Sequence, residues 1–96
     1  MKEKIINYKP KNAKLLRIKI ETTDDGRIKK IRIYGDFFIY PEEKIEDIES
    51  SLIGLPISDL DFIRETLNKI VNEKHIEMIG ISPDTIVEAI SRIKEL

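Results

Sequence analysis

Few side chains in this 96-residue sequence have the chemistry of a catalytic group. There is no cysteine, and the one histidine, His75, has no acidic or thiol neighbour at the spacing of metal ligands. We therefore interpret His75 as a surface or helix-cap residue. Ser50 and Ser51 have no base at a recognisable spacing, so a nucleophile is not predicted there. These residue types predict neither a catalytic centre nor a metal site.

Motifs that bind nucleotides or other cofactors are also missing from the sequence. Gly26, Gly35, Gly54 and Gly80 are too scattered for a phosphate-binding loop or a dinucleotide fingerprint. Acidic residues gather between 42 and 49, but a helical period places them on the outward side of an amphipathic helix. These acids are Glu42, Glu43, Glu46, Asp47 and Glu49. We interpret them as a solvated face, and we expect the chain alone to bind no cofactor.

The most unusual segment is Tyr34-Gly35-Asp36-Phe37-Phe38. A strand that breaks at Gly-Asp and resumes with two aromatic residues directs one ring to the core and the other to the opposite side. In one interpretation both rings are core, and an arm or helix covers the far face. In the other, Phe37 or Phe38, with Asp36 on a bend that Gly35 permits, forms an exposed apolar patch that docks on another protein. Periodicity leaves both interpretations open.

Three strands are predicted to position this segment. From Lys14 to Ile20, isoleucine and leucine alternate with charged residues, which is typical of a strand with one buried face. The Asp24-Asp25-Gly26 run predicts a hairpin turn, and a second strand follows over residues 27–34. Ile28 is out of parity in that strand, which indicates a bulge or a residue still in the turn. Residues 37–40 predict a short third strand, apolar on both faces.

The second half of the sequence has a helical period. The first helix is predicted to begin at Pro41 and to be terminated by Gly54. A second is predicted over residues 59–72, after a capping box formed by Ser58 and Asp61. A third is predicted to begin at Ser82-Pro83-Asp84. Residues 1–13 lack a clean period, and we interpret them as an N-terminal arm. The predicted fold class is α+β, a three-stranded antiparallel meander followed by three helices packed on one face.

Length and composition predict one domain over residues 1–96. No apolar run reaches the roughly 18 residues that a membrane span needs, so neither a signal peptide nor an anchor is predicted. The absence of cysteine fits a reducing cytoplasm. Abundant Ile, Lys and Glu with no Gln resembles the composition of thermophilic proteins.

Charge is distributed unevenly along the chain. Residues 1–34 carry 11 Lys and Arg against 4 Asp and Glu, whereas the remaining residues carry 6 against 14. Basic strands and acidic helices, each with a solvated face, explain this asymmetry, but so does a basic surface for a phosphate-bearing or acidic partner. A nucleic-acid-binding module is disfavoured because the basic stretch from Lys14 to Arg32 lacks interleaved aromatic residues for base stacking.

Several motifs follow one another in a specific order along the chain. They are Lys14-Leu15-Leu16-Arg17-Ile18, an Asp25-Gly26 turn, Ile31 and Ile33, Gly35-Asp36-Phe37-Phe38-Ile39, Pro41-Glu42-Glu43, Glu49-x-x-Leu52-x-Gly54, and Gly80-Ile81-Ser82-Pro83-Asp84. From about Lys9 to Leu96, the sequence thereby resembles the C-terminal domain of lipoate-protein ligases. The family usually has a Gly-Gly pair where this sequence has Asn12-Ala13, which puts a close backbone approach at that loop in doubt.

The resemblance implies an accessory subunit and not a complete enzyme. Ligases of this family activate lipoate with ATP to lipoyl-adenylate and transfer the lipoyl group to a lysine of an acceptor domain. The small domain, fused or separate, is needed for activation, and its fold is similar to that of iron–sulfur scaffold and sulfur-acceptor proteins. The implied partners are a catalytic subunit and, indirectly, lipoyl acceptor domains; ATP, Mg and lipoate would belong to the assembled complex.

From the resemblance to this family, we predict a partner interface at one corner of the domain. The residues from Gly35 to Phe38 would supply apolar docking, and Lys14 and Arg17 would supply positive charge near the mouth of the active site. The predicted interface residues are Lys14, Arg17, Gly35, Asp36, Phe37 and Phe38. A purely structural interaction domain of another complex is compatible with the same periodicities and remains an alternative.

Overall fold

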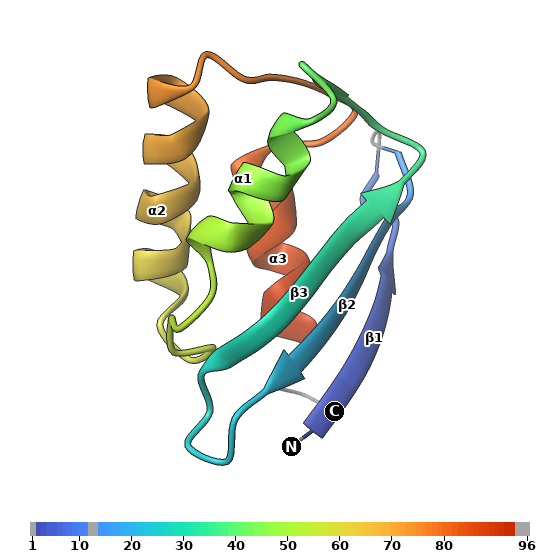
Figure 1. The fold of residues 1–96 in the computed structure, drawn as a ribbon. Coiled ribbons are helices and arrows are strands. Elements are labelled where there is room, and N and C mark those ends of the chain that lie inside the picture. Colours follow the sequence, from blue (N-terminus) through green and yellow to red (C-terminus); the bar gives the residue numbers. More distant parts are fainter. Residues whose placement is uncertain (1, 12–13, 94–96) are drawn as a thin grey trace.

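Strands β1, β2 and β3 form an antiparallel sheet in the computed structural model, which describes residues 2–11 and 14–93 (Figure 1). Their bounds are Lys2–Tyr8 for β1, Leu16–Thr22 for β2 and Ile28–Gly35 for β3. Alternate side chains of each strand face the core, because successive residues of a strand point to opposite faces. Ile18 of β2 lies opposite Ile6 of β1 and Ile33 of β3, and all three are buried.

A hairpin and a bulge connect β2 to β3. Gly26 has a φ of 82°, and the N–H of Thr23 donates to the carbonyl of Arg27 at 2.8 Å, which closes the predicted turn. The register shifts at the end of β2, where Thr22 lies opposite Ile28, one residue out of step with the rest of the pairing. The predicted irregularity at Ile28 is therefore confirmed.

The helices of the described chain, residues 2–11 and 14–93, lie on one face of this sheet (Figure 1). They are α1 at Lys44–Ser51, α2 at Leu60–Glu73 and α3 at Pro83–Ile93. Helix α1 contacts β3, α3 contacts β1 and β2, and α2 packs on α1 and α3. Aliphatic side chains from the sheet and the helices form the core between them. The predicted α+β class, with helices packed on one face of an antiparallel meander, is confirmed.

Helix starts agree only in part with the prediction. Ser82 accepts a hydrogen bond of 3.2 Å from the N–H of Thr85, which confirms the predicted cap of α3. At the start of α2, Asp59 accepts from the N–H of Phe62 at 3.1 Å. The capping box predicted at Ser58 is therefore wrong, because the N-cap position belongs to the next residue. Helix α1 begins three residues after the predicted Pro41.

His75 ends α2 in a left-handed conformation, with a φ of 53°. The N–H of Ile76 donates to the carbonyl of Val71 at 2.9 Å, and the N–H of His75 is directed to the carbonyl of Asn72 at 3.4 Å. This pair of bonds is the Schellman arrangement that commonly closes a helix. The side chain of His75 is exposed. The interpretation of His75 as a surface or cap residue is confirmed.

The third strand of the sheet is not the predicted one. Residues 37–40 were expected beside β3, but β4 at Phe38–Tyr40 pairs with β5 at Glu77–Ile79 in a separate ribbon. Strand β1 takes the third place instead, within the segment predicted as an arm. Its periodic signal is weak because its inward positions are Lys4, Ile6 and Tyr8, of which one is aliphatic.

Contacts with α3 hold β1 in the sheet. The hydroxyl of Tyr8 donates to Glu88 at 2.7 Å, and the guanidinium of Arg92 lies 4.6 Å from the centroid of the Tyr8 ring. Ile6 of the same strand is buried, and α3 packs against β1. Tertiary contacts therefore stabilise a strand whose own sequence pattern is weak.

The outer edge of β3 is occupied by α1 and by the loop that follows it. The N–H of Ile28 donates to the carbonyl of Leu55 at 2.9 Å, and the N–H of Gly54 donates to the carbonyl of Ile28 at 2.7 Å. Farther along, Glu49 of α1 accepts from the N–H of Ile33. These bonds take up the edge along which β4 was expected to pair. They also correct the prediction for Glu49, which is partly buried against β3 and not part of a solvated face.

Candidate functional site

Backbone segments from three parts of the chain meet at one corner of the domain. The N–H of Asp36 donates to the carbonyl of Leu15 at 3.0 Å, and the N–H of Lys14 donates to the carbonyl of Gly80 at 3.3 Å. A Cβ on Gly35 would overlap the carbonyl oxygen of Leu15, and a Cβ on Gly80 would lie 2.7 Å from the Cγ of Lys14. Glycine at both positions permits this close approach.

Four of the predicted interface residues lie at this corner. Lys14 and Asp36 have exposed side chains, Gly35 forms the bend, and Phe37 is partly buried and packs against the core. Phe37 also faces Gly80, because a Cβ added to Gly80 would lie 3.6 Å from the Cβ of Phe37. At this corner the segment before β2, the segment after β3 and the residue after β5 therefore lie close together.

Arg17 lies on a different surface, the solvent face of the main sheet. Its Nε donates to the side-chain oxygen of Asn7 on β1, and its guanidinium lies 5.7 Å from the centroid of the Tyr34 ring on β3. Asn7, Arg17 and Tyr34 form one row across the sheet. Contacts on both sides therefore hold the Arg17 side chain over the solvent face of the sheet.

Phe37 and Phe38 divide between the core and the surface, as strand alternation requires. Phe37 packs against the core, whereas Phe38 is 68% exposed. No residue within 2–11 and 14–93 covers the Phe38 ring enough to bury it. Of the two interpretations of this segment, the exposed patch is correct for Phe38 and the core is correct for Phe37.

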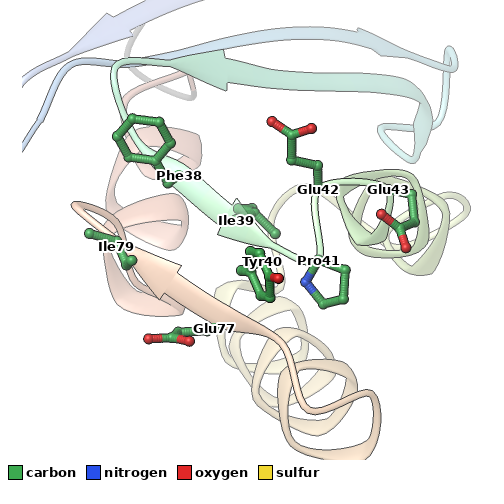
Figure 2. Close-up of a pocket in the computed structure, with 8 residues that line it drawn as sticks. All are labelled: Phe38, Ile39, Tyr40, Pro41, Glu42, Glu43, Glu77 and Ile79. Atoms are coloured by element: carbon green, nitrogen blue, oxygen red, sulfur yellow. The ribbon is translucent and has the colours of Figure 1, made fainter.

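Phe38 belongs to an apolar face that the β4–β5 ribbon turns to solvent. In the register of the two strands, Phe38 lies opposite Ile79 and Tyr40 lies opposite Glu77. Tyr40 is 69% exposed and Ile79 is 52% exposed, whereas Ile39 on the other face of β4 is buried. We call Phe38, Tyr40 and Ile79 the aromatic face. Figure 2 shows these side chains around the ribbon, together with the neighbouring glutamates.

The surface is hollowed on both sides of Phe38. One hollow of about 720 Å³ follows the ribbon to the start of α1; its lining residues are Phe38, Ile39, Tyr40, Pro41, Glu42, Glu43, Glu77 and Ile79. A second of about 320 Å³ lies between the end of β3, β4 and α1, and Phe38, Gly35 and Phe37 contribute to its lining. Phe38, Ile39 and Glu42 line both hollows, so the two depressions adjoin each other at the start of β4.

Tyr40 and Ile79 were not among the predicted interface residues. Tyr40 is two residues from Phe38, so the period of a strand could have placed both on one face. Ile79 had no comparable signal, because β5 is three residues long and pairs with a segment some forty positions away in the sequence. Pairing over such a separation is not encoded in a local pattern.

Within residues 2–11 and 14–93, no group of three or more His, Asp or Glu side chains is placed to hold a metal ion. In the same ranges the buried side chains are apolar. No helix in this part of the chain has the length and apolar character needed to cross a membrane.

Comparison with known proteins identifies the family. A family model described as the C-terminus of bacterial lipoate protein ligase matches residues 5–90. The chain is 35% identical over 85 residues to lipoate-protein ligase A subunit 2 of Thermoplasma acidophilum, covering 88% of this chain and 83% of that protein. The thermophile-like composition fits this source.

A solved structure is similar to this chain over nearly its whole length. It is one chain from an archaeal lipoylation system, a bi-partite lipoate protein ligase and its E2 lipoyl domain from Thermoplasma acidophilum. The TM-score is 0.76 at 30% identity, and the match covers 93% of this chain and 94% of the other. The sequence match and the common fold agree, and the chain belongs to the lipoate protein ligase C-terminal domain family.

Proposed function

We propose that this chain is the accessory subunit of a two-part lipoate-protein ligase, required with a separate catalytic subunit for ATP-dependent activation of lipoate to lipoyl-adenylate. Its relative in Thermoplasma acidophilum is named as a second ligase subunit, and its structural counterpart belongs to a bi-partite ligase. The observation that carries the proposal is an exposed apolar surface, formed by Phe38, Tyr40 and Ile79, on a chain of this family. We place the assembly in the cytoplasm.

The proposed contribution of the chain is conformational. ATP, Mg and lipoate are bound in the assembled complex, and the catalytic groups come from the partner. A subunit without catalytic groups promotes adenylation when it binds the activation-competent state of the catalytic chain more tightly than the inactive state. Moving such an equilibrium from about 1:99 to 99:1 takes a preference of roughly 10⁴-fold, or about 5.5 kcal/mol. That difference is less than half of the roughly 12 kcal/mol that a nanomolar complex provides.

Each predicted interface residue has a role in this proposal. Phe38 supplies apolar docking, and Gly35 and Phe37 fix the bend from which it projects. Lys14 and Asp36 provide exposed charges at the same corner. Arg17, oriented by Asn7 and Tyr34, supplies positive charge from the sheet toward the anionic substrates of the partner.

Adenylate formation by the catalytic chain, with and without this chain, tests the proposal. Pyrophosphate release is measured at saturating ATP, Mg and lipoate while the accessory chain is titrated. We expect the rate to rise at least tenfold and to saturate. Equal rates with and without the accessory chain contradict the proposal, and the isolated accessory chain serves as the control for contaminating ATP turnover.

The nucleic-acid alternative has less support. The solvent face of the main sheet carries Lys19, Lys30 and Arg32, but Glu3 and Glu21 lie among them, and Lys19 is 3.6 Å from Glu3. Exposed acids in a cationic face weaken attraction to phosphates. The family match favours lipoylation over this alternative. A salt-dependent shift with single-stranded RNA would reverse that ranking.

A further inference from the structure

The two sheets of the described chain, residues 2–11 and 14–93, present opposite chemistry to solvent. The solvent face of the main sheet is mostly charged, with Arg17, Lys19 and Arg32 among its residues. The solvent face of the β4–β5 ribbon carries Phe38, Tyr40 and Ile79. An antiparallel sheet with one face in water normally places polar residues on that face. The ribbon departs from this rule, which indicates that a partner covers it.

Glutamates surround the aromatic face. Glu42 and Glu43 lie at its α1 end, and Glu77 lies across from Tyr40 on β5 (Figure 2). All three side chains are exposed, and within residues 2–11 and 14–93 none of them is in an ion pair. The neighbouring Lys44 pairs with Asp47 at 3.5 Å and not with this rim. The surface therefore combines an apolar centre with unneutralised negative charge.

We propose that the aromatic face, with Glu42, Glu43 and Glu77 as its rim, binds a surface of the catalytic chain that is apolar at its centre and carries Lys and Arg around it. This inference rests on the proposed function and specifies the partner's chemistry. It moves the centre of the interface from the corner at Lys14 and Gly35 to the β4–β5 ribbon.

Charge argues against other occupants. A second copy of this chain, docked by a two-fold axis on the same face, would bring one acidic rim against another. Nucleic acids and anionic lipid surfaces carry negative charge, so the rim repels them. A protein surface with an apolar centre surrounded by Lys and Arg complements both the aromatic face and its acidic rim. Contact with Phe38 and Tyr40 also fits the enrichment of aromatic residues in the energetic centres of protein interfaces.

The test measures the dissociation constant of the two-chain complex by calorimetry, with thermal unfolding of each variant to confirm its fold. The apolar centre is removed by Phe38→Ala and Tyr40→Ala together, and the rim is reversed by Glu42→Lys, Glu43→Lys and Glu77→Lys together. Phe62→Ala is the matched control, because Phe62 is a 46% exposed phenylalanine on α2. We expect each set to weaken binding at least tenfold and the control to change it less than twofold.

The salt dependence of binding distinguishes the electrostatic contribution of the rim from the apolar contribution of the aromatic face. Raising salt should weaken binding of the unaltered chain, because salt screens the attraction between opposite charges, and this dependence should reverse in the rim-reversed variant, where like charges face each other. The inference is overturned if the unaltered chain binds and activates the catalytic chain while both folded variant sets bind equally well; the proposed function then survives. Absence of binding by the unaltered chain overturns both. Self-association that Tyr40→Ala abolishes would also overturn the inference.

Discussion

The carboxylate of Glu49 on α1 accepts a hydrogen bond of 2.7 Å from the backbone N–H of Ile33 on β3. The bond joins the first helix to the outer edge of the main sheet and satisfies a strand donor there. Burial raises the pKa of Glu49, and the Ile33 N–H and the charge of Arg32 oppose that rise. The helix therefore caps the sheet edge with a carboxylate that loses part of its hydration.

The raised pKa of Glu49 predicts a specific pH dependence of stability. A carboxyl with a higher pKa in the folded state binds more protons there, so its favourable contribution exists at low pH and is lost as pH rises from the ordinary glutamate pKa of about 4.5 through the folded pKa. Glu49→Gln keeps an acceptor for Ile33 but does not titrate. We expect the stability difference between variant and unaltered protein to shift in favour of Gln as pH rises, measured by urea unfolding between pH 4 and 7.

Removing the hydrogen-bond acceptor at residue 49 should lower the stability of the protein. Glu49→Ala leaves the Ile33 N–H without its partner, and we expect a loss of about 1–3 kcal/mol at pH 7. Equal stability of the Ala and Gln variants at that pH would contradict the structural role assigned to this bond.

Gly35 should tolerate substitution less well than Gly54. A Cβ on Gly35 would overlap the Leu15 carbonyl, whereas a Cβ on Gly54 would meet nothing within 4 Å. Gly54 has a φ of 88°, so Gly54→Ala carries a conformational cost of roughly 1–2 kcal/mol. We expect Gly35→Ala to cost about 1 kcal/mol more, which is roughly 4–8 °C in melting temperature for a domain of this size. Equal melting temperatures would contradict the close approach at the corner.

His75→Gly should stabilise the protein. The residue occupies the left-handed position that ends α2, where a side chain costs roughly 1–2 kcal/mol that glycine avoids. Part of this gain is offset by the larger entropy of glycine in the unfolded chain, so we expect a net gain of about 0.5–1 kcal/mol. Denaturant unfolding measures it, with His75→Ala as the control that retains the strain. A loss of stability would mean that the imidazole makes a contact beyond helix termination.

Substitution of Phe37 should affect stability, whereas substitution of Phe38 should affect association with the catalytic chain. Phe37 is partly buried against the core, so Phe37→Ala should lower the free energy of unfolding by roughly 2–4 kcal/mol. Phe38→Ala should stay within about 0.5 kcal/mol of the unaltered protein, because its ring is exposed. Melting temperature and affinity for the catalytic chain are measured on the same samples. A large stability loss from Phe38→Ala would place that ring in the core instead.

The fold class could be predicted because most elements have strong local patterns. Ile18 and Ile20 alternate with charged residues in β2, and the helices repeat aliphatic residues at a helical period. Strand β1 lacked such a pattern, because tertiary contacts through Tyr8 hold it in place. The place of β4 could not be read from its own residues either. It depends on α1 and its following loop, whose bonds to Ile33 and Ile28 occupy the edge of β3.

The candidate site could be predicted in part for similar reasons. Strand alternation predicted that one of Phe37 and Phe38 would face away from the core, but it left open which ring that was and whether another element covered it. The rest of the aromatic face depends on pairing between β4 and β5, which brings Ile79 beside Phe38 and Glu77 beside Tyr40. Charge at the rim becomes meaningful when these strands are placed together, because the glutamates come from separate segments of the chain.

In the proposed function, this chain acts by binding the surface of a catalytic subunit and does not perform the activation itself. Pyrophosphate release from ATP in the presence of lipoate tests it most directly, with each chain assayed separately and then together. We expect no turnover by this chain alone and at least a tenfold increase when it is added to the catalytic chain. Turnover by the isolated chain, or a catalytic chain that is equally active without it, would show that the proposed accessory role is wrong.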